Sequence, residues 1–159
     1  MPKPKIEKNS LLNLVKNSID TYKLNYPSIN FVLNNNNLED KIHCDKNQIG
    51  RVLVNVYKNA VESLEEKISK NNLNNPEIIT SLNENTISFL ITIEDNGIGF
   101  DEEKKNYDEP YFSTKKNGSG LGLSIVSKII HEHNGQIFYE NKTNKNGAII
   151  TITLPKINE

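Results

Sequence analysis

The stretch Asp95-Asn96-Gly97-Ile98-Gly99 precedes a second glycine run, Gly118-Ser119-Gly120-Leu121-Gly122-Leu123. The first stretch places one acidic residue in a glycine turn, and the second opens a segment with a helical pattern. A carboxylate can recognise a base, and bare backbone N–H groups at a helix N-terminus can bind phosphates. Glycine turns alone are common in loops, but the order of these two stretches predicts a nucleotide site.

The composition is that of a polar domain that can fold. Its 159 residues include 35% hydrophobic and 25% charged residues, and a chain of this length buries roughly two-thirds of its unfolded surface. The net charge of −1 argues against a nucleic-acid or membrane surface. Cys44 is the only cysteine, which excludes an intrachain disulfide and fits a reducing compartment. Because these residues hold no membrane-spanning run and no signal-peptide core, we expect a cytoplasmic protein.

Helical and strand patterns alternate along the chain. A first helix is capped by Asn9 or Ser10, and a long helix runs from Asp45 to about Ser69. The last helix is expected over residues 120–133, with Gly135 ending it. Strands are predicted at residues 29–33, 41–44, 76–82, 86–94, 136–140 and 148–154. This order predicts an α+β fold in which a mixed β-sheet packs against helices on one face.

Two apolar stripes predict which faces of a strand and a helix are buried. One long segment has no helical or strand periodicity in its hydrophobic residues. The alternation of Ile87, Phe89, Ile91 and Ile93 predicts a buried strand face. The last helix is expected to bury Leu121, Ile125, Ile129 and Ile130. Residues 100–117 are rich in charged residues and asparagine, which predicts a long loop of the kind that often serves as a lid.

The long helix carries a polar stripe opposite its apolar face. Asn55, Asn59 and Glu62 form this stripe, and Lys58 lies at its edge. Asn55 and Asn59 are one turn apart, so their amides point the same way. A carboxamide oxygen is a suitable Mg²⁺ ligand, and Mg²⁺ completes its shell with waters and phosphates. We therefore expect Asn59 to bind Mg²⁺ and Asn55 to reach the phosphates, although two solvated asparagines are the plain alternative in an asparagine-rich chain.

Four motifs in order resemble those of the catalytic ATP-binding domain of sensor histidine kinases. Residues 55–60 resemble the N box, residues 95–99 the G1 box, residues 107–115 the F box and residues 118–123 the G2 box. The resemblance covers nearly the whole chain from about residue 9. Glu62 and the Glu-Pro-Tyr-Phe-Ser-Thr-Lys segment of the F box look most like the nitrogen-regulation branch, with its NtrY-like and NtrB-like members.

The resemblance implies the Bergerat (GHKL) fold, an α+β two-layer sandwich that binds ATP under a mobile lid at about residues 100–118. It implies that residues 9–156 form the catalytic ATP-binding domain and that residues 1–8 are a linker or a fragment boundary. It also implies ATP and Mg²⁺ as ligands, with Asp95 accepting a hydrogen bond from the adenine amino group. The implied ATP-site residues, with no catalytic residue beyond them, are Asn55, Lys58, Asn59, Glu62, Asp95, Gly97, Ile98, Gly99, Thr114, Lys115, Gly118, Ser119, Gly120, Leu121, Gly122 and Leu123.

The implied activity is transfer of the γ-phosphate to a histidine on a dimerisation domain that we expect to be absent from this chain. None of His43, His131 and His133 has the setting of a phosphoacceptor, so we expect no autophosphorylation by the domain alone. The gyrase, mismatch-repair and chaperone branches have a Glu base at the position of Asn55, and an amide cannot accept that proton. Slow ATP hydrolysis is therefore expected.

The implied partners are the dimerisation and phosphoacceptor helices of a parent kinase and a downstream response regulator. No nucleic-acid or membrane contact is expected from this chain, which we expect to be a monomer as a fragment. Anchoring of the parent protein in the inner membrane, as in many relatives, is left open by these residues.

Two other functions fit the same motifs. A stand-alone GHKL partner-switching Ser/Thr kinase or anti-sigma-like regulator has the same fold, although the Tyr-Asp-Glu-Pro-Tyr-Phe segment favours the histidine kinase. A degenerate pseudokinase would bind partners only, and the intact Asn59 and Asp95 argue against it.

Overall fold

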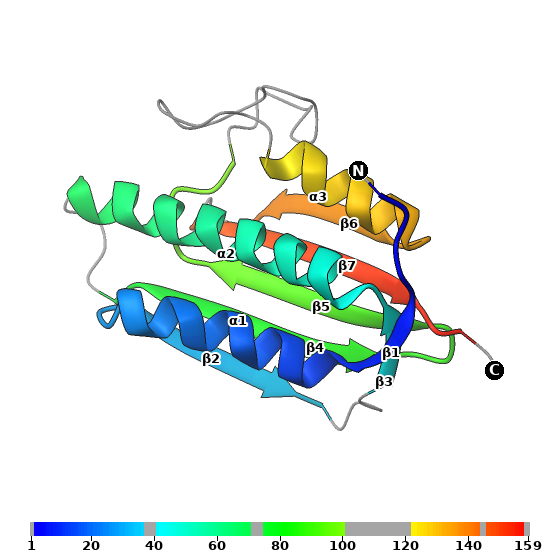
Figure 1. Ribbon diagram of the computed structural model, residues 1–159. Coiled ribbons are helices and arrows are strands. Elements are labelled where there is room, and N and C mark those ends of the chain that lie inside the picture. The colour runs from blue at the N-terminus through cyan, green and yellow to red at the C-terminus, as the bar shows by residue number, and fades with distance from the viewer. Residues whose placement is uncertain (1, 37–40, 71–74, 101–121, 144–145, 158–159) are drawn as a thin grey trace.

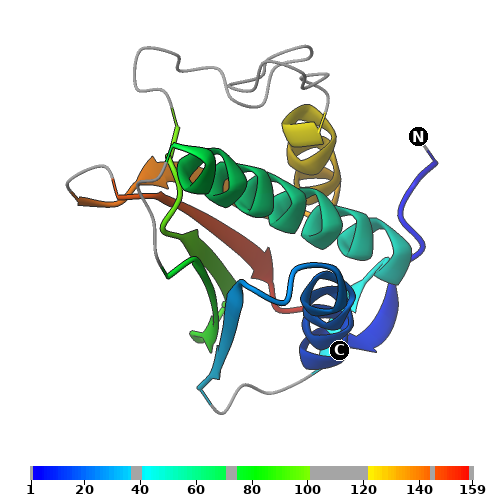
Figure 2. The same cartoon turned by 90° about the vertical axis from the view of Figure 1, so that its left-hand side faces the viewer.

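The computed structural model describes residues 2–36, 41–70, 75–100, 122–143 and 146–157. Helices and sheet form two layers, with the three labelled helices on one face of the larger sheet (Figures 1 and 2). The helices are α1 (Leu11–Asn25), α2 (Lys46–Ser69) and α3 (Gly122–Glu132).

The larger sheet has the strand order β2-β4-β5-β7-β6. Strands β2 and β4 are parallel, and every other neighbouring pair is antiparallel. This mixed sheet confirms the predicted α+β sandwich. The strands are β2 (Asn30–Asn35), β4 (Glu77–Glu84), β5 (Ser88–Asp95), β6 (Gln136–Asn141) and β7 (Ala148–Pro155).

The two long helices begin at side-chain caps. Ser10, rather than Asn9, caps α1, because its Oγ accepts a hydrogen bond from the Asn13 N–H at 3.1 Å. Asp45 caps α2 as predicted, and its Oδ1 accepts from the N–H groups of Asn47 and Gln48. Such caps satisfy backbone donors that the first helical turn leaves unpaired.

The end of α3 differs from the prediction. Asn134, with φ of 58°, adopts the left-handed conformation that ends the helix, a conformation that asparagine tolerates better than most residues. The Gly135 N–H then donates to the Ile130 carbonyl at 2.9 Å. Glycine is needed at 135 for a different reason, since an added Cβ would lie 2.3 Å from the Thr153 carbonyl oxygen.

A second, two-stranded sheet joins β1 (Glu7–Ser10) to β3 (Lys41–Cys44) in antiparallel register. The strand β3 has the predicted bounds, but the sequence did not predict β1, which starts inside the segment 1–8. Its four residues are polar and carry no alternation, so the pairing with β3 alone makes them a strand. Cys44 is fully buried, and burial raises the pKa of its thiol to about 11, as befits a packing residue.

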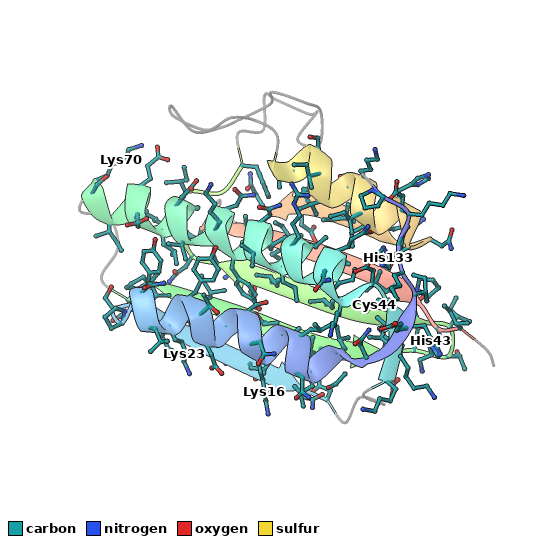
Figure 3. The ribbon with its side chains drawn as sticks, in the orientation of Figure 1. Lys16, Lys23, His43, Cys44, Lys70 and His133 are labelled. Atoms are coloured by element: carbon teal, nitrogen blue, oxygen red, sulfur yellow. The ribbon has the colours of Figure 1, made fainter. Side chains whose placement is uncertain are left out.

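His133 joins α3 to the start of α2. It lies at the end of α3, close to the N-terminal segment (Figure 3), and is 6% exposed. Its Nδ1 hydrogen-bonds the Ile129 carbonyl at 2.8 Å, and its Nε2 accepts from the Asp45 N–H at 3.1 Å. Because backbone groups engage both ring nitrogens, His133 has the structural role that its position suggested.

The core lies between the helices and the larger sheet, and it corrects two predicted faces. Phe89, Ile91 and Ile93 are buried as expected, but Ile87 precedes β5 and is 72% exposed. Helix α3 buries Ile129 and Ile130 together with Val126, whereas Ile125 is only partly buried. The predicted lid, apart from Phe100, and Leu121 of the predicted stripe lie outside the described residues.

Candidate nucleotide-binding site

The carboxylate of Asp95 lies at the end of the central strand β5 and is 5% exposed. Its Oδ1 accepts hydrogen bonds from the N–H groups of Gly97 at 2.8 Å and Ala148 at 3.4 Å. The Ser63 hydroxyl donates to the same oxygen at 3.5 Å. Within the described residues these contacts all end on Oδ1, and Oδ2 takes none of them.

Burial raises the pKa of the Asp95 carboxyl, and the two N–H donors oppose that rise by stabilising the anion. Lys142 also lowers the pKa through its charge. A buried acceptor with one oxygen already saturated can hold a hydrogen-bond donor of a ligand on the other oxygen. This is the chemistry that a base-recognising carboxylate needs.

The turn after Asp95 brings backbone close to its neighbours. A Cβ on Gly97 would lie 2.2 Å from the Ser63 Oγ. Gly99 has φ of +77°, a conformation that favours glycine, and a Cβ there would lie 2.6 Å from the Asn141 Oδ1. The structure therefore explains the requirement for both predicted glycines by close approach inside the protein.

The side chain of Asn96 ties this turn to the start of β4. Its Oδ1 accepts from the Glu77 N–H at 2.9 Å, and its Nδ2 donates to the Asn75 carbonyl at 2.8 Å. The Ile98 N–H, in turn, donates to the Ser63 Oγ at 3.0 Å. Successive residues of the turn are thus held by different parts of the fold.

The polar stripe predicted on α2 lies on the helix as expected. Asn55, Asn59 and Glu62 are partly exposed, and Lys58 is exposed, while the apolar face packs into the core. Helix α2 reaches the Asp95 turn through two residues that sequence analysis did not select, Ser63 and Lys67. The Lys67 Nζ donates to the Gly97 carbonyl at 3.3 Å.

A signal for these two residues was present in the sequence. Asn55, Asn59, Ser63 and Lys67 are spaced four residues apart, so they follow one ridge of the helix. Ser63 follows Asn59 by about 6 Å along the helix axis. The ridge therefore connects the contact to the Asp95 turn with the asparagines predicted to face the phosphates and Mg²⁺.

The remaining predicted site residues fall at or beyond the start of α3. Gly122 is the first described residue of α3, and Leu123 follows it, both partly buried. Helix α3 is described from Gly122, and residues 120 and 121 of the predicted helix lie outside the described part. Outside the described residues lie Thr114, Lys115, Gly118, Ser119, Gly120 and Leu121.

The side chains near the Asp95 turn fit an Mg²⁺ ion that is held mainly by the phosphates of a nucleotide. Among the described residues, no group of three His, Cys, Asp or Glu side chains could hold a metal ion. A single carboxamide such as that of Asn59 suits Mg²⁺, which takes one or two protein oxygens and fills its shell with phosphates and waters.

Among the helices that the structure describes, none is both long and apolar enough to cross a membrane.

Comparison with known proteins identifies the family. The family model described as "Histidine kinase-, DNA gyrase B-, and HSP90-like ATPase" matches residues 44–158. The chain belongs to this family. The resemblance and the GHKL fold predicted from the sequence are thereby confirmed.

The relatives include sensor and sporulation kinases. Sporulation kinase E of Bacillus subtilis is 39% identical over 115 residues, which cover 72% of this chain and 14% of that protein. An NtrY-like sensor histidine kinase of Rickettsia typhi is 35% identical over 153 residues, which cover 96% of this chain and 24% of that protein. The chain thus spans less than a quarter of the length of these relatives, and their names favour the kinase interpretation over the partner-switching regulator.

A solved structure supports the same assignment. The catalytic domain of histidine kinase ThkA is 28% identical, with a TM-score of 0.82, and the match covers 96% of each chain. The likeness extends over both layers of the fold.

Proposed function

We propose that this domain binds Mg-ATP and supplies its γ-phosphate to a histidine on the dimerisation helices of a two-component sensor kinase. The observation that carries this proposal is the buried Asp95 carboxylate, whose Oδ1 is saturated by protein donors. An ionised carboxylate only accepts hydrogen bonds. Its Oδ2 therefore suits the amino group of adenine and disfavours the 6-oxo group of hypoxanthine or guanine.

The α2 ridge supports the assignment of the phosphate end. Asn59 would ligate Mg²⁺, and Asn55 would contact the phosphates or a water of the metal. When bound, Mg²⁺ neutralises phosphate charge. The glycines of the second glycine run and the start of α3 would offer N–H groups to the phosphates, with Thr114 and Lys115 close to the γ-phosphate.

Asn55 also bears on the fate of the γ-phosphate. An amide has no basic oxygen or nitrogen that could take a proton from an attacking water. The domain would therefore hydrolyse ATP slowly and retain the γ-phosphate for a protein acceptor. A protein histidine kinase needs this property, because hydrolysis competes with transfer.

The relatives guide the choice of partners. A crystal structure shows ThkA in complex with the response regulator protein TrrA, and its ThkA chain is 26% identical to this one with a TM-score of 0.78. By analogy, the acceptor helices belong to the parent kinase, and a response regulator receives the phosphoryl group afterwards. We place the domain in the cytoplasm. This placement is compatible with a parent protein that is anchored in the inner membrane.

Calorimetric titration with Mg·AMPPNP tests the proposal. The wild type should bind in the micromolar to submillimolar range, and binding should weaken without Mg²⁺. Asp95→Asn should weaken binding by about 10- to 150-fold, the value of one hydrogen bond to a charged group. Asp20→Asn makes the same chemical change at an exposed position of α1 and should have no effect. A folded wild type that produces no binding heat would contradict the proposal.

A further inference from the structure

We infer that Ser63 and Asn141 are positioning residues that hold the turn from Asp95 to Phe100 in the shape that selects adenine. The inference rests on the proposed nucleotide function and adds the origin of base selectivity. Neither residue belongs to the motifs that the sequence displays. They contact the turn from two different elements, α2 and β6.

Ser63 fixes the orientation of the carboxylate. Its hydroxyl accepts from the Ile98 N–H at 3.0 Å and donates to the Asp95 Oδ1 at 3.5 Å, and one hydroxyl can do both. Ser63 is 9% exposed, so the protein supplies the partners of its hydroxyl. Together with the Gly97 N–H, it holds Oδ1 against the protein, which under the proposed function leaves Oδ2 for the base.

Asn141 fixes the other end of the turn. Its Oδ1 accepts from the Phe100 N–H at 2.6 Å, and its Nδ2 donates to the Phe100 carbonyl at 2.8 Å. This two-bond pairing engages both backbone groups of one residue, as a neighbouring strand would. The ring of Phe100 also packs edge-on against Tyr139 of β6, at 5.8 Å between centroids.

The β6–β7 hairpin completes the enclosure of the turn. A Cβ on Gly147 would lie 1.9 Å from the Asp95 carbonyl oxygen, and the Ala148 N–H donates to the Asp95 carboxylate. Asn141 and these two residues lie at the same end of the hairpin, since Asn141 pairs with Ala148. The turn is therefore clamped between α2 on one side and the hairpin on the other.

Selectivity follows from the direction of the free oxygen. A 6-amino group donates a hydrogen bond, whereas a 6-oxo group accepts one. The Asp95 Oδ2 can therefore favour the 6-amino group only if its lone pair is directed at that position of the base. A carboxylate that can rotate still only accepts hydrogen bonds, but it presents its acceptor less well to the 6-amino group, so the preference for adenine over a 6-oxo base becomes smaller. Loss of either clamp should therefore reduce discrimination between bases, beyond any general loss of affinity.

The test compares two nucleotides in the same chain. Mg·AMPPNP and its inosine counterpart, which carries a 6-oxo group, are titrated into the wild type, Ser63→Ala and Asn141→Ala. We expect the Kd of the inosine nucleotide divided by the Kd of Mg·AMPPNP to fall by about fivefold in Ser63→Ala and in Asn141→Ala, the equivalent of roughly one hydrogen bond. Asn141→Asp keeps the acceptor for Phe100 but loses the donor, and should give a smaller fall.

The matched control is Asn85→Ala. The Asn85 Oδ1 also accepts two backbone hydrogen bonds, from Ile87 at 3.0 Å and Ser88 at 2.8 Å, but at the opposite end of β5. Its loss should lower stability and leave the ratio unchanged. Circular dichroism identifies the variants that fold. If neither Ser63→Ala nor Asn141→Ala folds, the ratio is measured in Asn141→Asp instead.

Two results would count against the inference in different ways. Equal weakening of both nucleotides in Ser63→Ala and Asn141→Ala would show a purely structural role and overturn it. A folded wild type that binds neither nucleotide would overturn the proposed function itself, and the inference with it.

Discussion

Replacing Tyr57 with phenylalanine removes one half of a buried hydroxyl pair. The Tyr57 hydroxyl on α2 and the Thr80 Oγ1 on β4 lie 2.6 Å apart, and both residues are fully buried. The pair joins the helical layer to the sheet. Leaving one buried hydroxyl unpaired costs about 1–3 kcal/mol, whereas replacing both partners by apolar groups of the same shape can be nearly neutral.

We therefore expect Tyr57→Phe and Thr80→Val each to lower the free energy of unfolding by about 1–3 kcal/mol. For a domain of this size that corresponds to a fall in Tm of about 2–12 °C. The double variant should be more stable than the sum of the two losses predicts, because no hydroxyl is left unpaired. Urea unfolding gives the free energy of unfolding of the wild type, the two single variants and the double variant, and the comparison holds if their m values are equal.

Strict additivity would refute this reasoning. If the double variant lost the sum of the two single losses, the cost would come from packing around the rings of Tyr22, Phe31 and Tyr57, and not from the hydroxyl pair. A gain in stability for Tyr57→Phe alone would contradict it more directly.

The same substitution should have opposite effects at two glycines. Gly50→Ala, where an added Cβ meets nothing within 4 Å, should stabilise α2 by about 0.5–1 kcal/mol. Gly147→Ala, at φ of +124° where the added Cβ would lie 1.9 Å from the Asp95 carbonyl oxygen, should cost more than about 3 kcal/mol. Equal effects in urea unfolding would contradict both. Because burial raises the pKa of Asp95 from its ordinary 3.8, stability should fall as pH rises from 3.8 toward the raised pKa. Asp95→Asn should abolish this fall and raise the free energy of unfolding at neutral pH. Urea unfolding at several pH values measures this, and an unchanged pH profile would contradict it.

Local signals predicted most of the architecture. Asp45 precedes a long run with a helical period, and a side-chain cap needs only residues that follow it directly, so the bounds of α2 were predictable. The strand β3 and the pairing of β4 with β5 were equally local, since a short turn joins the hairpin. Strand β1 was missed because its polar residues become a strand only through β3, far along the chain.

The site shows the same division between local and distant information. Asp95 and its two glycines form one continuous stretch, so the sequence displays them together. Ser63 and Asn141 are single polar residues whose partners lie 35 and 41 positions away. Composition carries no trace of such pairings. Of the two residues, only Ser63 had a signal in the sequence, its four-residue spacing along the helix from Asn55 and Asn59. The error at Ile87 has the opposite origin, because the strand pattern continued one position beyond the pairing itself.

The central place of β5 in the larger sheet links the proposed base recognition to the stability of the fold. Asp95 is the last residue of a strand paired on both sides, with β4 and with β7. Moving the backbone of Asp95 would disturb its pairing with Ile78 of β4, next to the residues of β5 that pair with β7. An edge strand could fray and take a binding residue with it while the rest of the domain persisted. For Asp95, we expect the backbone that carries the proposed base-recognising carboxylate to be lost only when the central sheet unfolds.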